Sequence, residues 1–171
     1  IKASVSKTAG AQYPKAVVLS CLDSRVPVEL VFDQGIGDIF VGRVAGNIAD
    51  EDLIGSMEFG TKLSGAKLVF VLGHTACGAV KGVCDGAELG KLTGLLSKIK
   101  PAMNAVQGNK PEERTPANTE FVEKVIEQNV RETIAHVRAE SAILADLEKA
   151  GTIKIVGGIY DLKTGKVALI K

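Results

Sequence analysis

Short, nearly continuous apolar runs constrain the fold of this chain more than any other feature of its sequence. Three of them, residues 15–21, 38–42 and 67–73, combine β-branched side chains with few polar ones. Runs of this length without polar alternation are typical of strands that are buried on both faces, which is the usual state in a parallel sheet. The sequence therefore predicts three strands of such a sheet.

Two further apolar runs, residues 153–160 and 166–170, lie near the carboxyl end of the chain. The residues between them include Lys163-Thr-Gly165, which has the composition of a tight turn. Two strands joined by such a turn form a β-hairpin. We therefore expect an antiparallel strand at one edge of the sheet.

Helical patterns fill the intervals between the apolar runs. Residues 51–63 place apolar side chains at helical spacing, with Asp50 as the N-cap and Gly65 as the stop. Residues 119–149 carry a longer apolar stripe, and Ser141 within it indicates two helices or a bend. Strands that alternate with helices indicate an α/β fold, with a mainly parallel central sheet flanked by helices.

The length and charge of the chain limit its organisation and its partners. Its 171 residues match the size of one domain, and we expect a single domain over residues 1–171. The 21 basic and 20 acidic residues give a net charge of +1, which provides no electrostatic basis for binding nucleic acid or an anionic membrane. No apolar stretch approaches the roughly 18 residues needed to cross a bilayer.

The amino-terminal residues bear on the compartment. Residues 1–10 have neither the apolar core nor the cleavage pattern of a signal peptide. We expect a cytoplasmic protein. Because the chain lacks an initiator Met, the periplasm or an organelle is the alternative if an upstream targeting segment was removed.

Potential metal ligands follow two of the predicted strands. Cys21 ends one apolar run, and His74 and Cys77 form a H-x-x-C pair after another. Binding sites in such sheets gather at the carboxyl ends of the strands, so all three side chains are expected on one edge. Two thiolates and one imidazole suit zinc, and three protein ligands leave a fourth position open for catalysis. The alternatives are inert buried thiols or a redox dithiol of Cys21 and Cys77.

Cys21-Leu-Asp-Ser-Arg25 adds a carboxylate and a guanidinium close to the first thiol. An exposed Asp23–Arg25 pair would contribute little to stability. The functional interpretation is that Arg25 holds Asp23 ionised and oriented beside the metal. Asp23 then accepts a hydrogen bond from a metal-bound hydroxide. Cys84 and His136 lie outside both motifs, and we expect a packed thiol and a surface residue.

Together the two motifs resemble those of the β-class carbonic anhydrases, and the resemblance covers nearly the whole chain. It extends to residues 26–29, 37–41, 43–47, 77–79 and 157–161. It implies a zinc ion on Cys21, His74 and Cys77, with water or hydroxide as the fourth ligand. It also implies two states of Asp23. In the open state Asp23 pairs with Arg25, and in the closed state Asp23 itself becomes the fourth zinc ligand.

The resemblance also implies a substrate pocket. Gln12 matches a glutamine that hydrogen-bonds the substrate, and Phe40 and Phe59 match aromatic positions that form an apolar wall for carbon dioxide. The backbone near Gly78 is expected to stabilise the developing bicarbonate oxygens. Several of these groups reach the zinc from the neighbouring subunit in the family. A homodimer or a dimer of dimers is therefore expected, with an amino-terminal helical arm that is short or missing.

One branch of the family carries an inhibitory bicarbonate site. Arg43 and Tyr160 match two of its members, but Val18 stands at the position of its tryptophan, and the chain contains no Trp. Together with Gln12, this departure favours the open, unregulated type.

The activity that the resemblance implies is zinc-dependent reversible hydration of carbon dioxide to bicarbonate and a proton, which is a lyase reaction. Two alternatives keep the same zinc site. One is hydrolysis of a related small molecule such as carbon disulfide. The other is a noncatalytic protein that binds zinc and bicarbonate.

Overall fold

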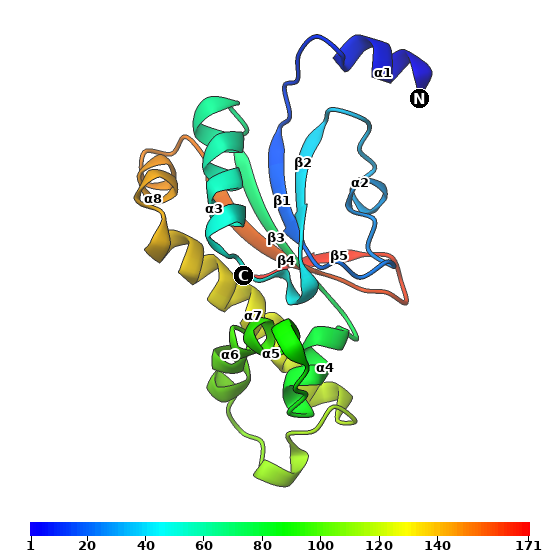
Figure 1. Ribbon diagram of the computed structural model, residues 1–171, viewed down its shortest axis with the longest axis vertical. Coiled ribbons are helices and arrows are strands. Elements are labelled where there is room, and N and C mark those ends of the chain that lie inside the picture. The colour runs from blue at the N-terminus through cyan, green and yellow to red at the C-terminus, as the bar shows by residue number, and fades with distance from the viewer.

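The computed structural model describes all residues, 1–171, around a five-stranded sheet of order β2-β1-β3-β4-β5 (Figure 1). The strands are β1 Ala16–Ser20, β2 Ile39–Arg43, β3 Leu68–His74, β4 Lys154–Tyr160 and β5 Val167–Leu169. The first four run parallel, and β5 pairs antiparallel with β4. The predicted mainly parallel sheet with an antiparallel edge strand is confirmed.

Eight α-helices surround the sheet: α1 Lys2–Thr8, α2 Val28–Val31, α3 Glu51–Glu58, α4 Gly78–Cys84, α5 Gly90–Ser97, α6 Lys100–Ala105, α7 Thr119–Glu140 and α8 Ala142–Lys149. Shorter turns are η1 Ala45–Asn47, η2 Phe59–Leu63 and η3 Pro111–Glu113. In Figure 1, α4, α5 and α6 lie beyond the carboxyl ends of β1 and β3, whereas α1 stands away from the sheet. None of the helices combines the length and the apolarity that a bilayer-spanning helix needs.

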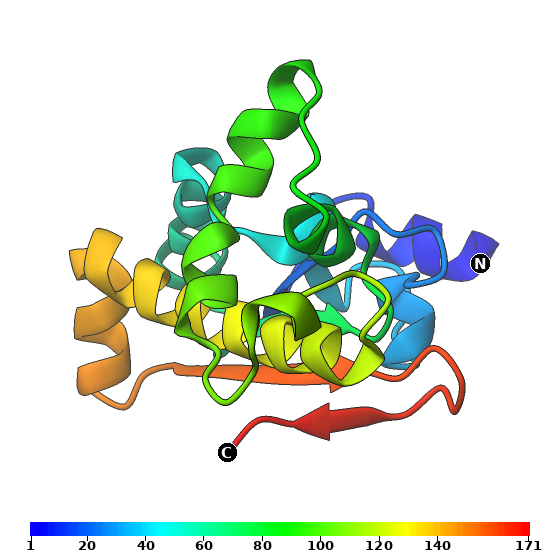
Figure 2. The same ribbon diagram turned by 90° about the horizontal axis from the view of Figure 1, so that it is seen from below.

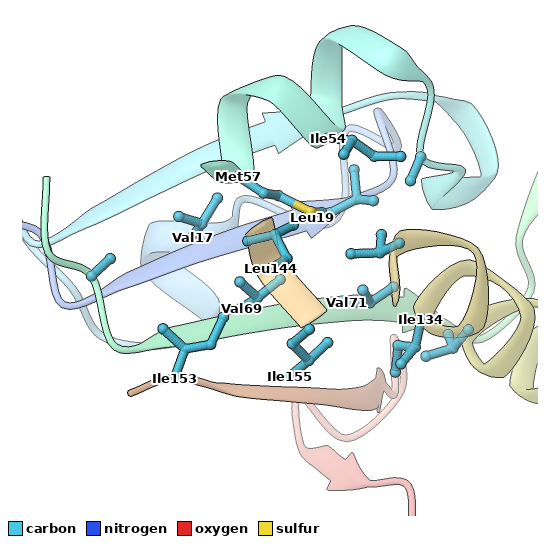
Figure 3. Close-up of a cluster of buried hydrophobic side chains, with 14 residues drawn as sticks. Val17, Leu19, Ile54, Met57, Val69, Val71, Ile134, Leu144, Ile153 and Ile155 are labelled. Atoms are coloured by element: carbon cyan, nitrogen blue, oxygen red, sulfur yellow. The ribbon is translucent and has the colours of Figure 1, made fainter. Parts of the chain in front are cut away.

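Helices α3, α7 and α8 cover one face of the sheet. Figure 3 shows the side chains that fill this layer, among them Leu19 from β1, Met57 from α3 and Leu144 from α8. A smaller apolar cluster on the opposite face packs Val18 and Phe70 against the region of α2. Because β1 and β3 are covered on both faces, their side chains are apolar without alternation, as the sequence pattern indicated.

The long helix α7 packs closely on the sheet and lies lengthwise along β4 (Figure 2). Glycine in the strand makes this approach possible. A Cβ atom on Gly157 would lie 2.6 Å from Val130 Cγ1 and 2.8 Å from Ile134 Cδ1. The bend predicted at Ser141 is confirmed, because Ser141 ends α7 and its hydroxyl accepts the Leu144 N–H as the N-cap of α8.

The helix predicted over residues 51–63 is regular only as far as Glu58. Its N-cap is confirmed, since the Asp50 side chain accepts the N–H of Leu53. Beyond Glu58 the chain forms the wider π-helical turn η2. This turn lays Gly60 against β1, where an added Cβ would lie 2.5 Å from Val17 Cγ2. Close contact with the strand thus replaces the last turn of regular helix.

Candidate metal centre

Three buried side chains meet at the carboxyl ends of the central strands. Cys21 follows β1, His74 is the last residue of β3, and Cys77 is the N-cap of α4. Their ligand atoms all lie within 4.8 Å of one another, and none of the three residues is more than 4% exposed. The structure thus brings together the three ligands predicted from the sequence.

The hydrogen bonds of His74 test whether this cluster fits a metal ion. Its Nδ1 lies 2.8 Å from the carbonyl oxygen of Thr75, which can only accept, so Nδ1 carries the proton. The unprotonated Nε2 is buried and has no hydrogen-bond partner. An unpaired buried nitrogen beside two thiols is costly unless a cation binds it. Two sulfurs and one imidazole nitrogen are the donor set of catalytic zinc sites, and the cluster fits that ion.

The pKa values of the two thiols shift in opposite directions. A hydrogen bond from Cys77 lowers the pKa of Cys21 despite its burial, and the nearby His74 side chain and the Gly46 amide lower it further. The same Cys77–Cys21 bond, together with burial, raises the pKa of Cys77. Cys21 is therefore the more acidic of the two thiols. Metal binding requires both sulfurs as thiolates, so it would release the proton of Cys77.

Asp23 is held beside this cluster by Arg25. The guanidinium donates from Nε to Oδ1 at 2.9 Å and from Nη2 to Oδ2 at 2.7 Å, and the Arg25 backbone N–H also donates to Oδ1. These bonds hold the pKa of Asp23 well below its usual range. The Asp23–Arg25 pairing inferred from the sequence is present, and it is the arrangement that the resemblance assigns to the open state.

Two side chains outside the motifs brace the loops that carry the ligands. Arg43 donates from Nε to the Cys21 carbonyl at 2.9 Å and from Nη2 to the Asp23 carbonyl at 2.5 Å. Glu123 on α7 accepts the N–H of Ala76, which has a φ of +53° between the two ligands of the H-x-x-C pair. The family resemblance matches Arg43 to the inhibitory bicarbonate site of one branch, not to this bracing role. No local sequence pattern singles out Glu123.

A third bracing residue, Asn129, is also on α7. Its Nδ2 donates to the Gly46 carbonyl at 2.7 Å, and the Gly46 N–H donates to Cys21 Sγ at 3.3 Å. The sequence did contain a signal for Asn129, because it lies within the apolar stripe of α7 beside Ile126 and Val130, where a buried polar side chain requires a partner.

The predicted substrate residues fall into two groups. Gly78 directly follows Cys77 and opens α4 beside the metal cluster. Gln12 is exposed in the segment before β1, and Phe40 and Phe59 pair their rings 5.9 Å apart over β1 and β2. These two rings line an open cavity of about 580 Å³ that includes none of the three metal ligands.

The distance along β2 explains this separation. Phe40 is in register with Val17, near the amino end of β1, whereas Arg43 at the end of β2 contacts the Cys21 loop. Within one chain, the aromatic pair therefore lies about three residues, or roughly 10 Å, down the strand from the ligand end. A larger cavity of about 870 Å³ between α3 and α7 also contains none of the ligands.

The other two candidate residues lie outside the cluster. Cys84 ends α4, packs against the apolar cluster around α7, and has a pKa raised by burial, as a packed thiol should. His136 is exposed on α7, in agreement with its interpretation as a surface residue.

Known proteins resemble this chain over most of its length. The sequence profile of the carbonic anhydrase family matches residues 16–167. The carbonic anhydrase of Mycolicibacterium smegmatis is 37% identical over 164 residues, which cover 93% of this chain and 76% of that protein. The β-carbonic anhydrase of Coccomyxa, solved with acetazolamide, superposes with a TM-score of 0.87 at 26% identity, covering 99% of this chain and 77% of that one.

A more distant relative has a different name. The carbon disulfide hydrolase of an Acidianus species is 32% identical over 106 residues, which cover 61% of this chain and 50% of that protein. The carbonic anhydrase profile covers far more of the chain, and the Coccomyxa enzyme shares its fold throughout. The chain therefore belongs to the β-carbonic anhydrases, a family of lyases.

Proposed function

We propose that this protein catalyses the reversible hydration of carbon dioxide to bicarbonate and a proton, with zinc held by Cys21, His74 and Cys77. The observation that carries the proposal is the unpaired, buried Nε2 of His74, which lies within 4.8 Å of the sulfur atoms of Cys21 and Cys77. Three protein ligands leave room for a fourth, which is typical of catalytic zinc rather than structural zinc. Family membership supports the same reaction.

Cys21, His74 and Cys77 would hold the zinc ion, which would supply a nucleophile at neutral pH by lowering the pKa of a water molecule to about 7. The residues of the chain orient that nucleophile and receive the product. The Asp23 carboxylate accepts a hydrogen bond from the hydroxyl group of the nucleophile. Its Oδ2 lies 3.7 Å from His74 Nε2. Arg25 keeps Asp23 ionised and fixes its plane through two hydrogen bonds.

Negative charge develops on the oxygens of carbon dioxide as bicarbonate forms. Gly78 opens α4, and the first amides of a helix have no intrahelical partner. The Gly78 N–H is therefore a donor for that charge, close to the ligand Cys77. A Cβ atom at position 78 would meet no other atom within 4 Å, so the space beside this residue is open.

We also propose that the working unit is a homodimer or a dimer of dimers, in which Gln12, Phe40 and Phe59 complete the pocket of the partner. Helix α1 buries none of its residues, and Phe59 remains 49% exposed beside an open apolar cavity. Exposed apolar surface of this kind is typical of an interface. The position of these residues, remote from their own chain's ligands, supports a role across that interface.

Carbon disulfide hydrolysis is the second candidate, favoured by the 32% identity to the Acidianus hydrolase over 106 residues. The two reactions use linear substrates of similar shape, so access to the pocket rather than the ligand set separates them. A noncatalytic zinc and bicarbonate-binding protein is the third. It would retain the metal without turnover.

The test is stopped-flow hydration of carbon dioxide by zinc-quantified protein over about pH 6 to 9, a range that brackets the expected pKa of about 7. We expect about one zinc per chain and rapid turnover. Asp23→Ala should keep the zinc and lose turnover, whereas Asp85→Ala, at an exposed aspartate after α4, should change neither. Full zinc occupancy with no hydration would overturn the proposal, and consumption of carbon disulfide alone would favour the second candidate.

A further inference from the structure

Helix α7 buries an asparagine against the loop that faces the metal cluster. Asn129 is only 2% exposed, and its Nδ2 lies 2.7 Å from the Gly46 carbonyl oxygen. Because a carbonyl oxygen only accepts, the side-chain atom that faces it must be the amide nitrogen. A buried polar side chain is costly without a partner, so this contact determines the position of Asn129.

Gly46 also contacts Cys21, one of the three candidate metal ligands. Its N–H donates to Cys21 Sγ at 3.3 Å, and its backbone is left-handed, with φ 72° and ψ 13°. A Cβ atom at this position would lie 2.5 Å from Ile99 Cδ1 and 3.3 Å from Ala79 Cβ. Ile99 and Ala79 thus leave no room for a side chain at Gly46, while the Asn129 amide holds the Gly46 carbonyl and the Gly46 N–H points at the sulfur.

We propose that Asn129 is a positioning residue for the metal centre, which holds the Gly46 amide against Cys21 Sγ and so sets how strongly that thiolate donates to the metal. This inference rests on the proposed metal site at Cys21, His74 and Cys77. A hydrogen bond to a thiolate withdraws electron density from the sulfur. The bound metal then keeps more of its positive charge, which offsets part of the neutralisation caused by two thiolate ligands.

A second residue on the same helix separates this role from simple packing. Thr133, one turn further along α7 and 5% exposed, donates from Oγ1 to the Asn47 carbonyl at 3.3 Å. The Asn47 N–H goes to the Val44 carbonyl and not to a sulfur. Thr133 therefore ties α7 to the same loop, next to Gly46, without reaching a ligand.

The experiment compares Asn129→Asp and Asn129→Leu with Thr133→Val in protein loaded with cobalt(II) in place of zinc. Aspartate keeps the shape of asparagine, but it places a carboxylate oxygen, which can only accept, opposite the Gly46 carbonyl oxygen. Leucine keeps the approximate volume of asparagine and has no hydrogen-bonding group. In both Asn129 variants we expect the thiolate-to-cobalt charge-transfer absorption to move to lower energy. We also expect zinc affinity, measured by competition with a chelator, to fall about 10–100-fold. Thr133→Val should lower the thermal stability about as much as the Asn129 variants do, but it should leave the thiolate-to-cobalt absorption unchanged.

Equal spectral shifts in all three variants, or no shift in the Asn129 variants, would overturn the inference and leave Asn129 as a packing residue. Failure of the wild-type protein to bind cobalt or zinc would instead overturn the metal site itself. If the Asn129 variants do not fold, the wild-type protein loaded with an NMR-active cadmium isotope provides the test. The Gly46 amide should show scalar coupling to cadmium through the N–H···S bond, and its absence would also overturn the inference.

Discussion

The Oδ2 atom of Asp23 lies 3.7 Å from Nε2 of His74, the nitrogen of the ligand cluster that has no partner. A carboxylate this close can either orient a nucleophile beside the metal or occupy the metal's open position itself. The hydrogen bonds from Arg25 favour the first arrangement, because they engage both carboxylate oxygens. The orientation of Asp23 therefore depends on a guanidinium whose side chain is 56% exposed.

Replacing this guanidinium tests that dependence. Arg25→Gln removes the bonds that orient Asp23, and we expect hydration near neutral pH to fall by about 10²-fold or more with zinc retained. The pKa of Asp23 should rise toward its ordinary value, which still leaves the carboxylate ionised at neutral pH. The loss should become smaller at alkaline pH, where hydroxide competes better with Asp23 for the metal. Stopped-flow rates at the two ends of the pH range measure this.

The matched control is Arg131→Gln, at an exposed arginine of α7 that pairs with Glu127 one turn away. This variant should hydrate carbon dioxide at the wild-type rate. A loss in Arg25→Gln that is equally large at neutral and alkaline pH would contradict competition between Asp23 and hydroxide. It would indicate that Arg25 acts only by orienting the carboxylate.

A second prediction concerns the thiols of chelator-treated protein. The hydrogen bond between Cys77 and Cys21 lowers the pKa of Cys21 and raises the pKa of Cys77. We therefore expect one thiolate per chain at neutral pH. A group with a lowered pKa keeps its charge above that pKa, so the thiolate should disappear only on acidification well below neutral. Ultraviolet thiolate absorbance, followed by titration, measures it. Cys21→Ser should abolish the signal, and Cys84→Ser, at a thiol whose pKa is raised, should leave it. Absence of a thiolate at neutral pH would contradict the lowered pKa of Cys21.

The sequence was sufficient to predict that the three candidate ligands lie together, but not which residues brace them. Cys21, His74 and Cys77 could be placed together because two of them end buried parallel strands, and such strand ends meet at one edge of the sheet. The partners of Glu123 and Asn129 lie 47 and 83 residues away in the sequence. Contacts of this kind depend on how α7 lies across the sheet, which local periodicity does not specify.

The predicted boundaries differ where close packing overrides local preference. Residues 59–63 continue the apolar spacing of α3, yet they widen into η2 because Gly60 fits against Val17. Similarly, a glycine such as Gly157 is expected to weaken the strand β4, because it has no side chain to pack. In the structure it is the point at which Val130 and Ile134 of α7 contact the sheet.

The packing of α7 on β4 gives a third prediction. In Gly157→Ala the added methyl group would meet Val130 Cγ1 at 2.6 Å, so we expect a loss of about 1–3 kcal/mol in the free energy of unfolding. Gly55→Ala is the control, because Gly55 lies within α3 with no atom close to the added methyl, and it should stabilise the protein by about 0.4–1 kcal/mol. Urea denaturation of zinc-loaded protein measures both. Equal stabilities of the two variants would mean that α7 does not pack closely on β4.

The last prediction concerns the site that two chains are proposed to share. Cys77→Ala should lose the metal but keep the aromatic pair, whereas Phe59→Ala should keep the metal but lose part of the wall. If Phe59 serves the partner's metal, a mixed dimer contains one complete pocket, formed by the metal ligands of the Phe59→Ala chain and the Phe59 of the Cys77→Ala chain. Refolding the two variants together in equal amounts should then restore activity to about a quarter of the wild-type value, since half of randomly paired dimers are mixed and each has one complete site.

Each variant refolded alone provides the baseline, and zinc content should equal the fraction of Phe59→Ala chains in every mixture. A mixture whose activity is only the average of its two components would mean that Phe59 acts within its own chain or not at all. Dilution of the wild-type protein gives an independent measurement. Activity per chain should fall at the concentration at which light scattering or sedimentation shows dimers separating, because the exposed rings then leave the partner's pocket.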